Sequence, residues 1–111
     1  MVSYRFIRHQ VIDGIHVATF TLDMLHAEAV NEVRTLDQLG KNVALVIDFR
    51  NIRHLVSGSL FPEHSPFGPI LKLQKEMKAS GQQLVLCGMS SDLRSLFCAT
   101  RFDHLFEIHA D

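Results

Sequence analysis

The chain has 111 residues, of which 47% are hydrophobic, and this is the size and composition of one globular domain with its own core. Its 11 Lys and Arg residues and 12 Asp and Glu residues leave a formal net charge of −1, with no basic stripe of the kind that nucleic-acid-binding domains carry. It contains no run of about 18 apolar residues that could span a membrane, and it does not begin with the apolar segment of a signal peptide. We therefore expect one cytoplasmic domain over residues 1–111 that binds neither nucleic acid nor membrane.

The first two elements form a predicted β-hairpin. Tyr4 to Ile12 and Ile15 to Phe20 are rich in β-branched and aromatic residues, which favour strands. Asp13-Gly14 lies between them, and this dipeptide is typical of the two-residue turns that join hairpin strands.

A helix is predicted next, from Met24 to Leu39. Apolar residues recur there every three or four positions, which builds one stripe on a helix. Thr21 or Asp23 can cap its start, and Gly40 can end it. The stripe consists of Leu22, Leu25, Ala29, Val33, Leu36 and Leu39. The polar residues expected on the solvated side are Glu28, Asn31, Glu32, Arg34 and Gln38.

The strongest predicted strand is the apolar run from Val43 to Ile47, which ends at Asp48. Unbroken apolar runs are typical of parallel strands that are buried on both faces. Residues 52–56 are a short predicted extension. The segment from Ser57 to Pro69 is rich in Pro, Gly and Ser and is predicted to be a loop. Loops of this length in a small domain are often functional.

Two further helices and a strand are predicted in the second half. The helices run from Pro69 to Ala79 and from Asp92 to Ala99, and the buried strand is Gln83 to Cys87. Pro69 suits the first position of a helix, and Ser90 or Ser91 can cap the last one. Residues 102–108 form a final apolar segment. The helical residues expected to face inward are Ile70, Leu73, Met77, Leu93, Leu96 and Phe97, with Leu71 beside them.

Strands that alternate with helices after an opening hairpin indicate an α/β fold. We expect a mixed β-sheet, an opening hairpin and about three helices.

Residues that could carry catalysis or bind a metal show no matching pattern. The seven histidines have none of the HxxxH or HExxH spacings of metal sites. Cys87 and Cys98 form no CxxC pair, which favours two buried thiols. Asp48 has no accompanying nucleophile and base. We expect no catalytic residues, no metal and no cofactor.

Four phrases of the sequence occur in a recognisable order. A central strand ends in an aspartate and leads into a Ser-containing turn, over residues 43–48 and 52–58. A helix and a strand of the form Gly-polar-polar-Leu-Val-Leu follow at residues 71–75 and 81–86. The closing phrases are Met89-Ser90-Ser91-Asp92-Leu93-Arg94 and Phe102-Asp103-His104-Leu105-Phe106-Glu107-Ile108. In this order and spacing they resemble the STAS domains, the fold of bacterial anti-anti-sigma factors, over nearly the whole chain.

The resemblance implies regulation by partner switching. An anti-anti-sigma factor (anti-sigma factor antagonist) binds an anti-sigma factor that is also a serine kinase. Phosphorylation of a serine in the turn before the second helix breaks this contact, since a phosphate adds about −1.5 to −2 charges.

The turn departs from the family pattern. The family's turn is Asp-Ser-Ser-Gly with the first serine phosphorylated, whereas this chain has Leu55-Val56-Ser57-Gly58. Val56 has no hydroxyl group, so Ser57 and Ser59 are the candidate phosphoacceptors. An insertion at about residues 61–67 also separates Ser57 from the helix N-terminus, whose dipole normally lies near such a site.

We expect the partner, an anti-sigma factor resembling a serine kinase, to dock on the turn and on the face of the second helix. Two alternatives stay open. One is a ligand-binding or enzymatic α/β domain whose loop, residues 60–67, forms a lid over Asp48 and the histidines. The other is a STAS-like module with a structural or oligomeric role, such as a homodimer. The expected partner-binding residues are Val56, Ser57, Gly58, Ser59, Leu60, Phe61 and Phe67.

Overall fold

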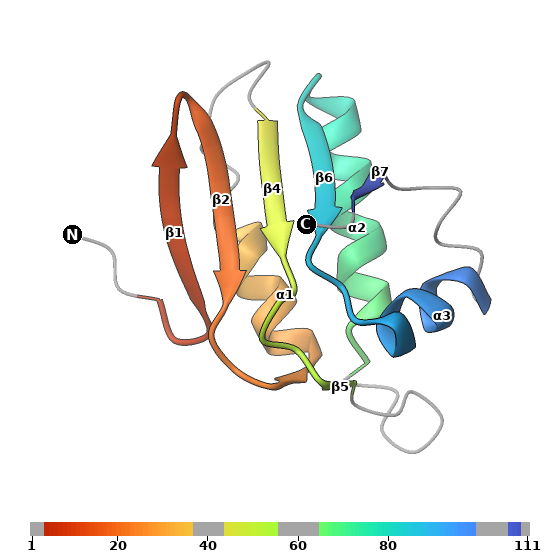
Figure 1. Cartoon of the computed structure of the whole chain (residues 1–111). Helices are drawn as coiled ribbons and strands as arrows, with labels where there is room; N and C mark the ends of the chain where they lie inside the picture. Colours follow the sequence, from red (N-terminus) through yellow and green to blue (C-terminus); the bar gives the residue numbers. More distant parts are fainter. Residues whose placement is uncertain (1–3, 37–43, 56–64, 100–106, 110–111) are drawn as a thin grey trace.

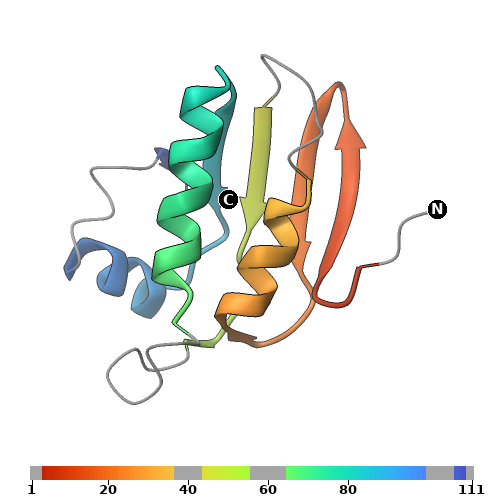
Figure 2. The same cartoon turned by 180° about the vertical axis from the view of Figure 1, so that it is seen from behind.

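The computed structural model describes residues 4–36, 44–55, 65–99 and 107–109. The main sheet has five strands in the order β1-β2-β4-β6-β7, in which β1 is antiparallel to β2 and the other neighbours are parallel. Helices α1 and α2 lie side by side on one face of this sheet (Figures 1 and 2). A second sheet pairs the two-residue strands β3 and β5. This architecture confirms the expected α/β fold with a mixed sheet and an opening hairpin.

The elements, in chain order, are β1 (Ile7–Ile12), β2 (Ile15–Phe20), β3 (Met24–Leu25), α1 (Ala27–Arg34), β4 (Ala44–Asp48), β5 (His54–Leu55), α2 (Phe67–Ala79), β6 (Gln83–Cys87), α3 (Ser91–Ala99) and β7 (Glu107–His109).

The hairpin forms where the sequence predicts it. Its strands pair from Ile7 opposite Phe20 to Ile12 opposite Ile15. The turn residues Asp13 and Gly14 have φ angles of 52° and 79°, the left-handed values that a two-residue hairpin turn requires and that Asp-Gly tolerates.

Helix α1 begins later than predicted. Residues 24–25 form strand β3 instead of a first helical turn, and the N-cap is His26 rather than Thr21 or Asp23. The His26 Nδ1 atom accepts a hydrogen bond from the Ala29 amide at 3.2 Å, which satisfies one of the amides that a helix start leaves unpaired. The prediction failed because pairing of β3 with the distant β5 overrides the local helical pattern.

The C-terminal end of α1 also differs from the prediction. The helix ends at Arg34, and Thr35 is its C-cap. Leu36 is buried beyond it. The predicted end at Leu39 and the terminator Gly40 lie outside the described residues.

Glu32 of α1 is half-buried and hydrogen-bonded, whereas the sequence pattern had indicated a residue on the solvated side of the helix. Its carboxylate accepts hydrogen bonds from the amides of three consecutive residues, Arg5 at 2.8 Å, Phe6 at 2.7 Å and Ile7 at 3.2 Å. These bonds fasten the entry of β1 to the helix, and a carboxylate is the strongest side-chain acceptor for such amides.

Strand β4 lies in the middle of the sheet, as predicted, but the described helices cover only one of its faces. Leu45 and Ile47, which face the helices, are 1% and 2% exposed, whereas Val46 on the other face is half-buried. The expectation of burial on both faces is therefore wrong for the amino-terminal part of this strand.

Helix α2 begins at Phe67, two residues before the predicted start, and its N-cap is Pro66. Pro69 is then the third helical residue, where its missing N–H still has no intrahelical partner to lose. Ile70, Leu73 and Met77 face the core as expected.

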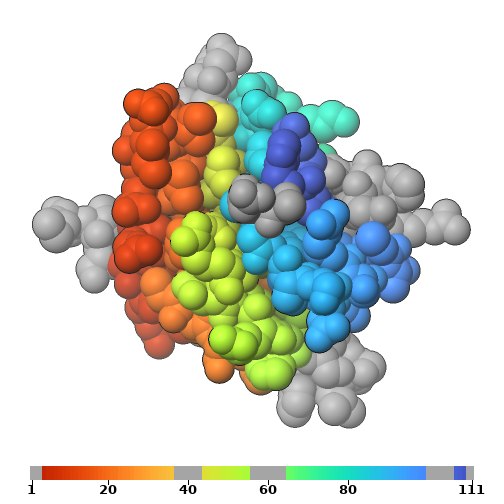
Figure 3. Space-filling view, in the orientation of Figure 1, coloured from red at the N-terminus to blue at the C-terminus, as the bar shows by residue number. Residues whose placement is uncertain are grey.

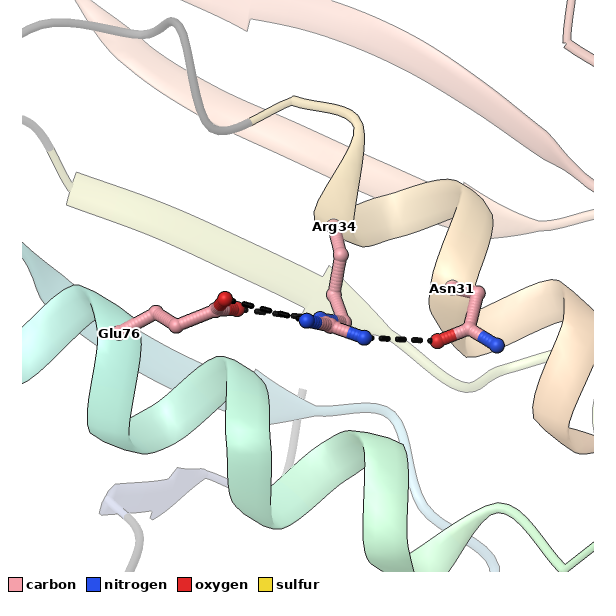
Figure 4. A network of polar contacts seen from close by, with 3 residues as sticks. All are labelled: Asn31, Arg34 and Glu76. Carbon is pink, nitrogen blue, oxygen red and sulfur yellow. Dashed lines mark hydrogen bonds and ion pairs between the residues drawn. The ribbon is translucent and has the colours of Figure 1, made fainter.

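An ion pair joins the outer surfaces of α1 and α2. Arg34 donates to both carboxylate oxygens of Glu76, at 3.0 and 3.1 Å, and to Asn31 Oδ1 at 3.0 Å (Figure 4). The arginine hydrogen bond is the main reason that the pKa of Glu76 lies below its ordinary value. Because the pair is largely exposed, it fixes the alignment of the helices more than it stabilises the fold.

Helix α3 begins one residue before the predicted start, and Ser90 is the side chain that caps it, through a hydrogen bond from the Leu93 amide to Ser90 Oγ at 3.2 Å. Leu93 and Phe97 point inward as predicted, but Leu96 is 44% exposed, so its inward assignment is wrong. Cys87 is buried, whereas Cys98 is exposed, which contradicts the expectation for the second thiol.

The core lies between the sheet and the helices, and a row of phenylalanines extends it toward α3. Phe20 packs on Phe49 at 5.3 Å between ring centroids, Phe49 on Phe97 at 6.3 Å, and Phe97 on Phe67 at 5.7 Å. Phe20, Phe49 and Phe97 are at most 1% exposed. The row therefore ties α3 to the carboxyl end of the sheet.

Candidate functional site

The candidate site lies at the carboxyl ends of β4 and β6, where the chain turns out of the sheet and runs into β5 (Figure 1). The backbone there is held by hydrogen bonds from the amides of Arg53 and His54 to the Asp23 carbonyl, at 2.7 and 3.0 Å. The Asn51 side chain donates to the Phe20 carbonyl at 2.9 Å. This segment is therefore a rigid platform that carries the chain to residue 55.

A hollow of about 220 Å³ opens on this platform between β5 and α3. Its volume lies below the range of about 300–1,000 Å³ that is typical of small-molecule sites. The lining is apolar at the floor and charged at the rim, and it consists of Ile52, Arg53, His54, Leu55, Asp92, Leu93 and Leu96. A space of this size and lining suits one or two side chains of a protein partner.

The rim of the hollow has charged groups that are available to a partner. Arg53, His54 and Asp92 are exposed, and their side chains form no hydrogen bond or ion pair with other described residues. Nearby, Met24 on β3 pairs with His54 on β5 and is 44% exposed, as is Leu96. Apolar and charged groups thus alternate over this end of the molecule.

Asp48 has a structural role in the turn that follows β4. Its side chain is 4% exposed. Its Oδ1 atom accepts a hydrogen bond from the Arg50 amide at 2.9 Å, and its Oδ2 atom accepts one from Arg50 Nε at 2.6 Å. Asp48 does not line the hollow that contains His54. The carboxylate therefore closes a turn, and the structure does not bring it together with His54 in one pocket.

Gly88 explains how the buried Asp48 carboxylate fits. Gly88 has a φ angle of 72°, and a Cβ atom at this position would overlap Asp48 Oδ1 and lie 3.1 Å from the Arg50 amide nitrogen. Only glycine allows this backbone to approach the carboxylate so closely.

Of the expected partner-binding residues, the structure describes only Phe67. It is the first residue of α2, is half-buried, and packs on Phe97. The others, Val56, Ser57, Gly58, Ser59, Leu60 and Phe61, lie outside the described residues.

The described histidines do not converge on one site. His9 and His16 are hydrogen-bonded to each other across the hairpin, with 2.8 Å between Nε2 and Nδ1. The pKa of His9 lies below its ordinary value, mainly because the side chain is partly buried and secondly because of the charge of His16. His109 contacts Glu107. Among the described residues, no three His, Cys, Asp or Glu side chains come close enough to hold a metal ion.

Nor does any helix in the described ranges have the length and apolar character needed to cross a bilayer.

Comparisons with known proteins identify the fold. No protein-family model matches the chain, and no curated protein sequence matches it. A proposed anti-sigma factor antagonist from Thermotoga maritima superposes with a TM-score of 0.71 at 14% identity, over 95% of this chain and 86% of that one. An anti-sigma-factor antagonist (STAS) domain protein from Planctomyces limnophilus superposes with a TM-score of 0.67 at 18% identity, over 95% of this chain and 90% of that one. The chain therefore has the STAS fold, and the resemblance seen in the sequence is confirmed at this level.

The predicted partner-binding turn stays a prediction, and sequence reasoning did not predict the hollow. The buried row of α3 consists of Leu93 and Phe97, which are four residues apart. Leu96 lies beside this row and is exposed. That Arg53 and Asp92 share one rim depends on how α3 packs beside β5, which no local pattern encodes.

Proposed function

We propose that the chain is a single STAS-like domain that acts as an anti-sigma factor antagonist, a cytoplasmic regulatory module without enzymatic activity that binds an anti-sigma factor. The fold supports this proposal, because two solved structures with the same fold are described as anti-sigma factor antagonists. The observation that carries it is the hollow at the end of β5, which combines apolar and charged lining residues and has exposed Leu96 on its wall. The turn containing Ser57 follows β5 directly in the chain.

The hollow has the character of an interface anchor site. Binding energy in protein interfaces is concentrated where an apolar side chain fills a pocket and excludes water. Leu55, Leu93 and Leu96 supply the apolar wall, and the charged rim supplies orientation. The partner-binding surface in this proposal joins the hollow to Phe67 and to the turn residues Val56, Ser57, Gly58, Ser59, Leu60 and Phe61.

The direct test is capture of the anti-sigma factor. The tagged domain is used to capture proteins from the native cell, and an anti-sigma factor resembling a serine kinase is identified by mass spectrometry and then purified. Calorimetric titration of that protein gives the dissociation constant for the wild type and for Leu96→Glu. We expect Leu96→Glu to weaken binding at least about 30-fold, the loss of a hot-spot contact.

The matched control is Ile12→Glu, because Ile12 is 54% exposed at the opposite end of the molecule. This variant should bind like the wild type. Recovery of no anti-sigma factor, or equal binding by both variants, would contradict the proposal.

Regulation by phosphorylation is the finer part of the proposal. Ser57 is the first candidate acceptor and Ser59 the second, and a phosphate at either would add about −1.5 to −2 charges to a surface that must dock closely. Incubation with the purified partner and ATP should add the mass of one phosphate to the intact chain. Ser57→Ala should abolish this addition, and Ser57→Asp should weaken binding. An unchanged mass for the wild-type chain would refute the switch and leave the binding proposal intact.

A further inference from the structure

The main sheet has one face that no described helix covers. Helices α1 and α2 both lie on the opposite face (Figures 1 and 2), and α3 is tied to the carboxyl end of the sheet through Phe97. Strands β2, β4, β6 and β7 are parallel neighbours, and parallel strands in proteins almost always have both faces covered. Among the described residues, this face without a covering helix is therefore the unusual feature.

The uncovered face is apolar across several strands. The register places Val17, Val46 and Val85 side by side, and all three are half-buried. Ile12 and Ile15 continue the same face toward the hairpin turn and are 54% and 42% exposed. We call this surface, in the amino-terminal half of the parallel strands, the open face. Its apolar residues are Ile12, Ile15, Val17, Ala44, Val46 and Val85, and the exposed Gln10 and Gln83 lie in the same rows.

The carboxyl half of the same side is already closed. Thr19, Asp48 and Cys87 form the next row of the register and are 4%, 3% and 8% exposed. Figure 3 looks onto this side of the molecule, with β1, β2 and β4 at the surface in its upper half and the segment after β4, together with α3, in its lower half.

The two outer strands on this side of the sheet carry opposite charges, with Arg8 one row beyond the open face and Glu107 within it. Arg8 on β1 stands opposite Thr19 in the register, on the open side of the sheet, is exposed, and forms no ion pair or hydrogen bond with its side chain among the described residues. At the far edge, Glu107 on β7 stands beside Val85, is exposed, and contacts Gln83 and His109. An apolar centre with one basic and one acidic edge is complementary to a second copy of itself.

We propose that the open face is a dimerisation surface that binds the open face of a second copy of this chain. A two-fold axis that runs roughly along β4, but is inclined to it so that the two sheets meet at the hairpin end, lays the Val46 side chain near its counterpart and brings the Arg8 edge of each copy toward the Glu107 edge of the other. Such a contact has two-fold symmetry, so it stops at a dimer and uses the same residues on both copies. The sheets are nearest at the hairpin end and diverge toward the carboxyl ends, so the hollow stays accessible.

The size of the surface sets the expected affinity. Five strands spaced about 4.8 Å apart and two alternate rows along them, about 6.8 Å apart, cover roughly 300 Å² on each copy. The total of roughly 600 Å² lies below the limit of about 1,000 Å² for specific interfaces and corresponds to a weak, transient contact. The dimer should therefore be concentration-dependent, with a dissociation constant on the order of 100 micromolar.

The test is sedimentation velocity of the purified chain over a series from low micromolar to several hundred micromolar. The wild type should shift from monomer to dimer within this range. Ile15→Lys and Val46→Lys should each raise the dissociation constant about a hundredfold, because each places like charges together across the axis. Ile15→Lys changes an exposed residue and keeps the test valid if Val46→Lys fails to fold, which far-UV circular dichroism reports.

Two controls distinguish specific dimerisation through this surface from nonspecific association. Val11→Lys alters the most exposed large apolar residue among those described, at 57%, but on the opposite side of β1, and it should leave the dimer unchanged. Arg8→Glu should raise the dissociation constant about tenfold, and the double variant Arg8→Glu, Glu107→Arg should restore it. A wild type that is monomeric throughout, or a dimer that only Val11→Lys disrupts, would overturn the proposal. Neither outcome bears on binding of an anti-sigma factor at the hollow.

Discussion

The two faces of the main sheet are made by the same strands but have different environments. Ala18, Ile47 and Leu86 face α1 and α2 and are at most 2% exposed, whereas their neighbours Val17, Val46 and Val85 on the open face are half-buried. The strand sequences are apolar on both faces, so composition alone does not distinguish them. The difference teaches that helix placement determines which face becomes core and which remains available to a partner.

The largest expected difference between the faces concerns Ile47 and Val46, adjacent residues of β4. Ile47→Ala should lower the free energy of unfolding by about 3 kcal/mol, because it leaves a cavity in the packed core. Val46→Ala should cost about 1 kcal/mol in the monomer, since its side chain keeps part of its contact with water. Urea denaturation at low protein concentration measures both. Equal costs would mean that the open face is as fully packed as the covered one.

The second prediction concerns the end at which the open side is closed by the turn after β4. Gly88→Ala should cost about 2–3 kcal/mol, because the left-handed backbone is strained and the methyl group displaces the Asp48 carboxylate. Gly14→Ala is the matched control. Gly14 also has a positive φ, 79°, but no atom lies within 4 Å of the added Cβ, so only backbone strain of about 1 kcal/mol applies. Thermal unfolding of the two variants gives the comparison, and similar losses would show that the contact with Asp48 does not matter.

The third prediction concerns how the covered face is fastened at its β1 edge. Glu32→Ala should lower stability by about 2 kcal/mol, since three consecutive amides lose a charged acceptor. Glu28→Ala, on the same helix and exposed, should change stability by about 0.5 kcal/mol or less. Amide hydrogen exchange should show faster opening at residues 5–7 in the Glu32 variant alone. Slow exchange there would contradict the fastening role of Glu32.

The smallest expected effect is a pH dependence at the hairpin, where His9 lies on the same side of the sheet as Ala18. Burial lowers the pKa of His9 below its ordinary value of 6.5, so the folded state binds fewer protons than the unfolded state. The contribution of neutral His9 to the free energy of unfolding is fully present above pH 6.5. It is lost as the pH falls below this value and through the pKa of the folded state. Denaturation midpoints at about pH 8 and about pH 5 should differ less in His9→Gln than in the wild type. His16→Gln removes only the minor cause and should have a smaller effect, and the opposite order would refute this assignment.

The candidate site shows where sequence reasoning stopped. The β4 strand, its terminal aspartate and the helix that begins near Pro69 were predicted close to their observed positions. The role of Asp48 was not predicted, because it depends on the close approach of Gly88. The exposure of Leu96 was not predicted, because it depends on where α3 packs. The turn at Ser57 stays a prediction from the sequence resemblance.

The sequence by itself determined the types and order of most elements, though not β3, because strand and helix periodicities, the Asp-Gly turn and the Ser90 cap are local signals that need no distant partner. Only the tertiary structure decided the start of α1, the partner of Glu32, the hollow beside β5 and the openness of one sheet face. Each of these depends on segments far apart in the chain, as when β3 pairs with β5 and replaces a helical turn with a strand. An unbroken apolar run specifies that both faces of a strand can be buried, but it carries no information about which face receives the helices.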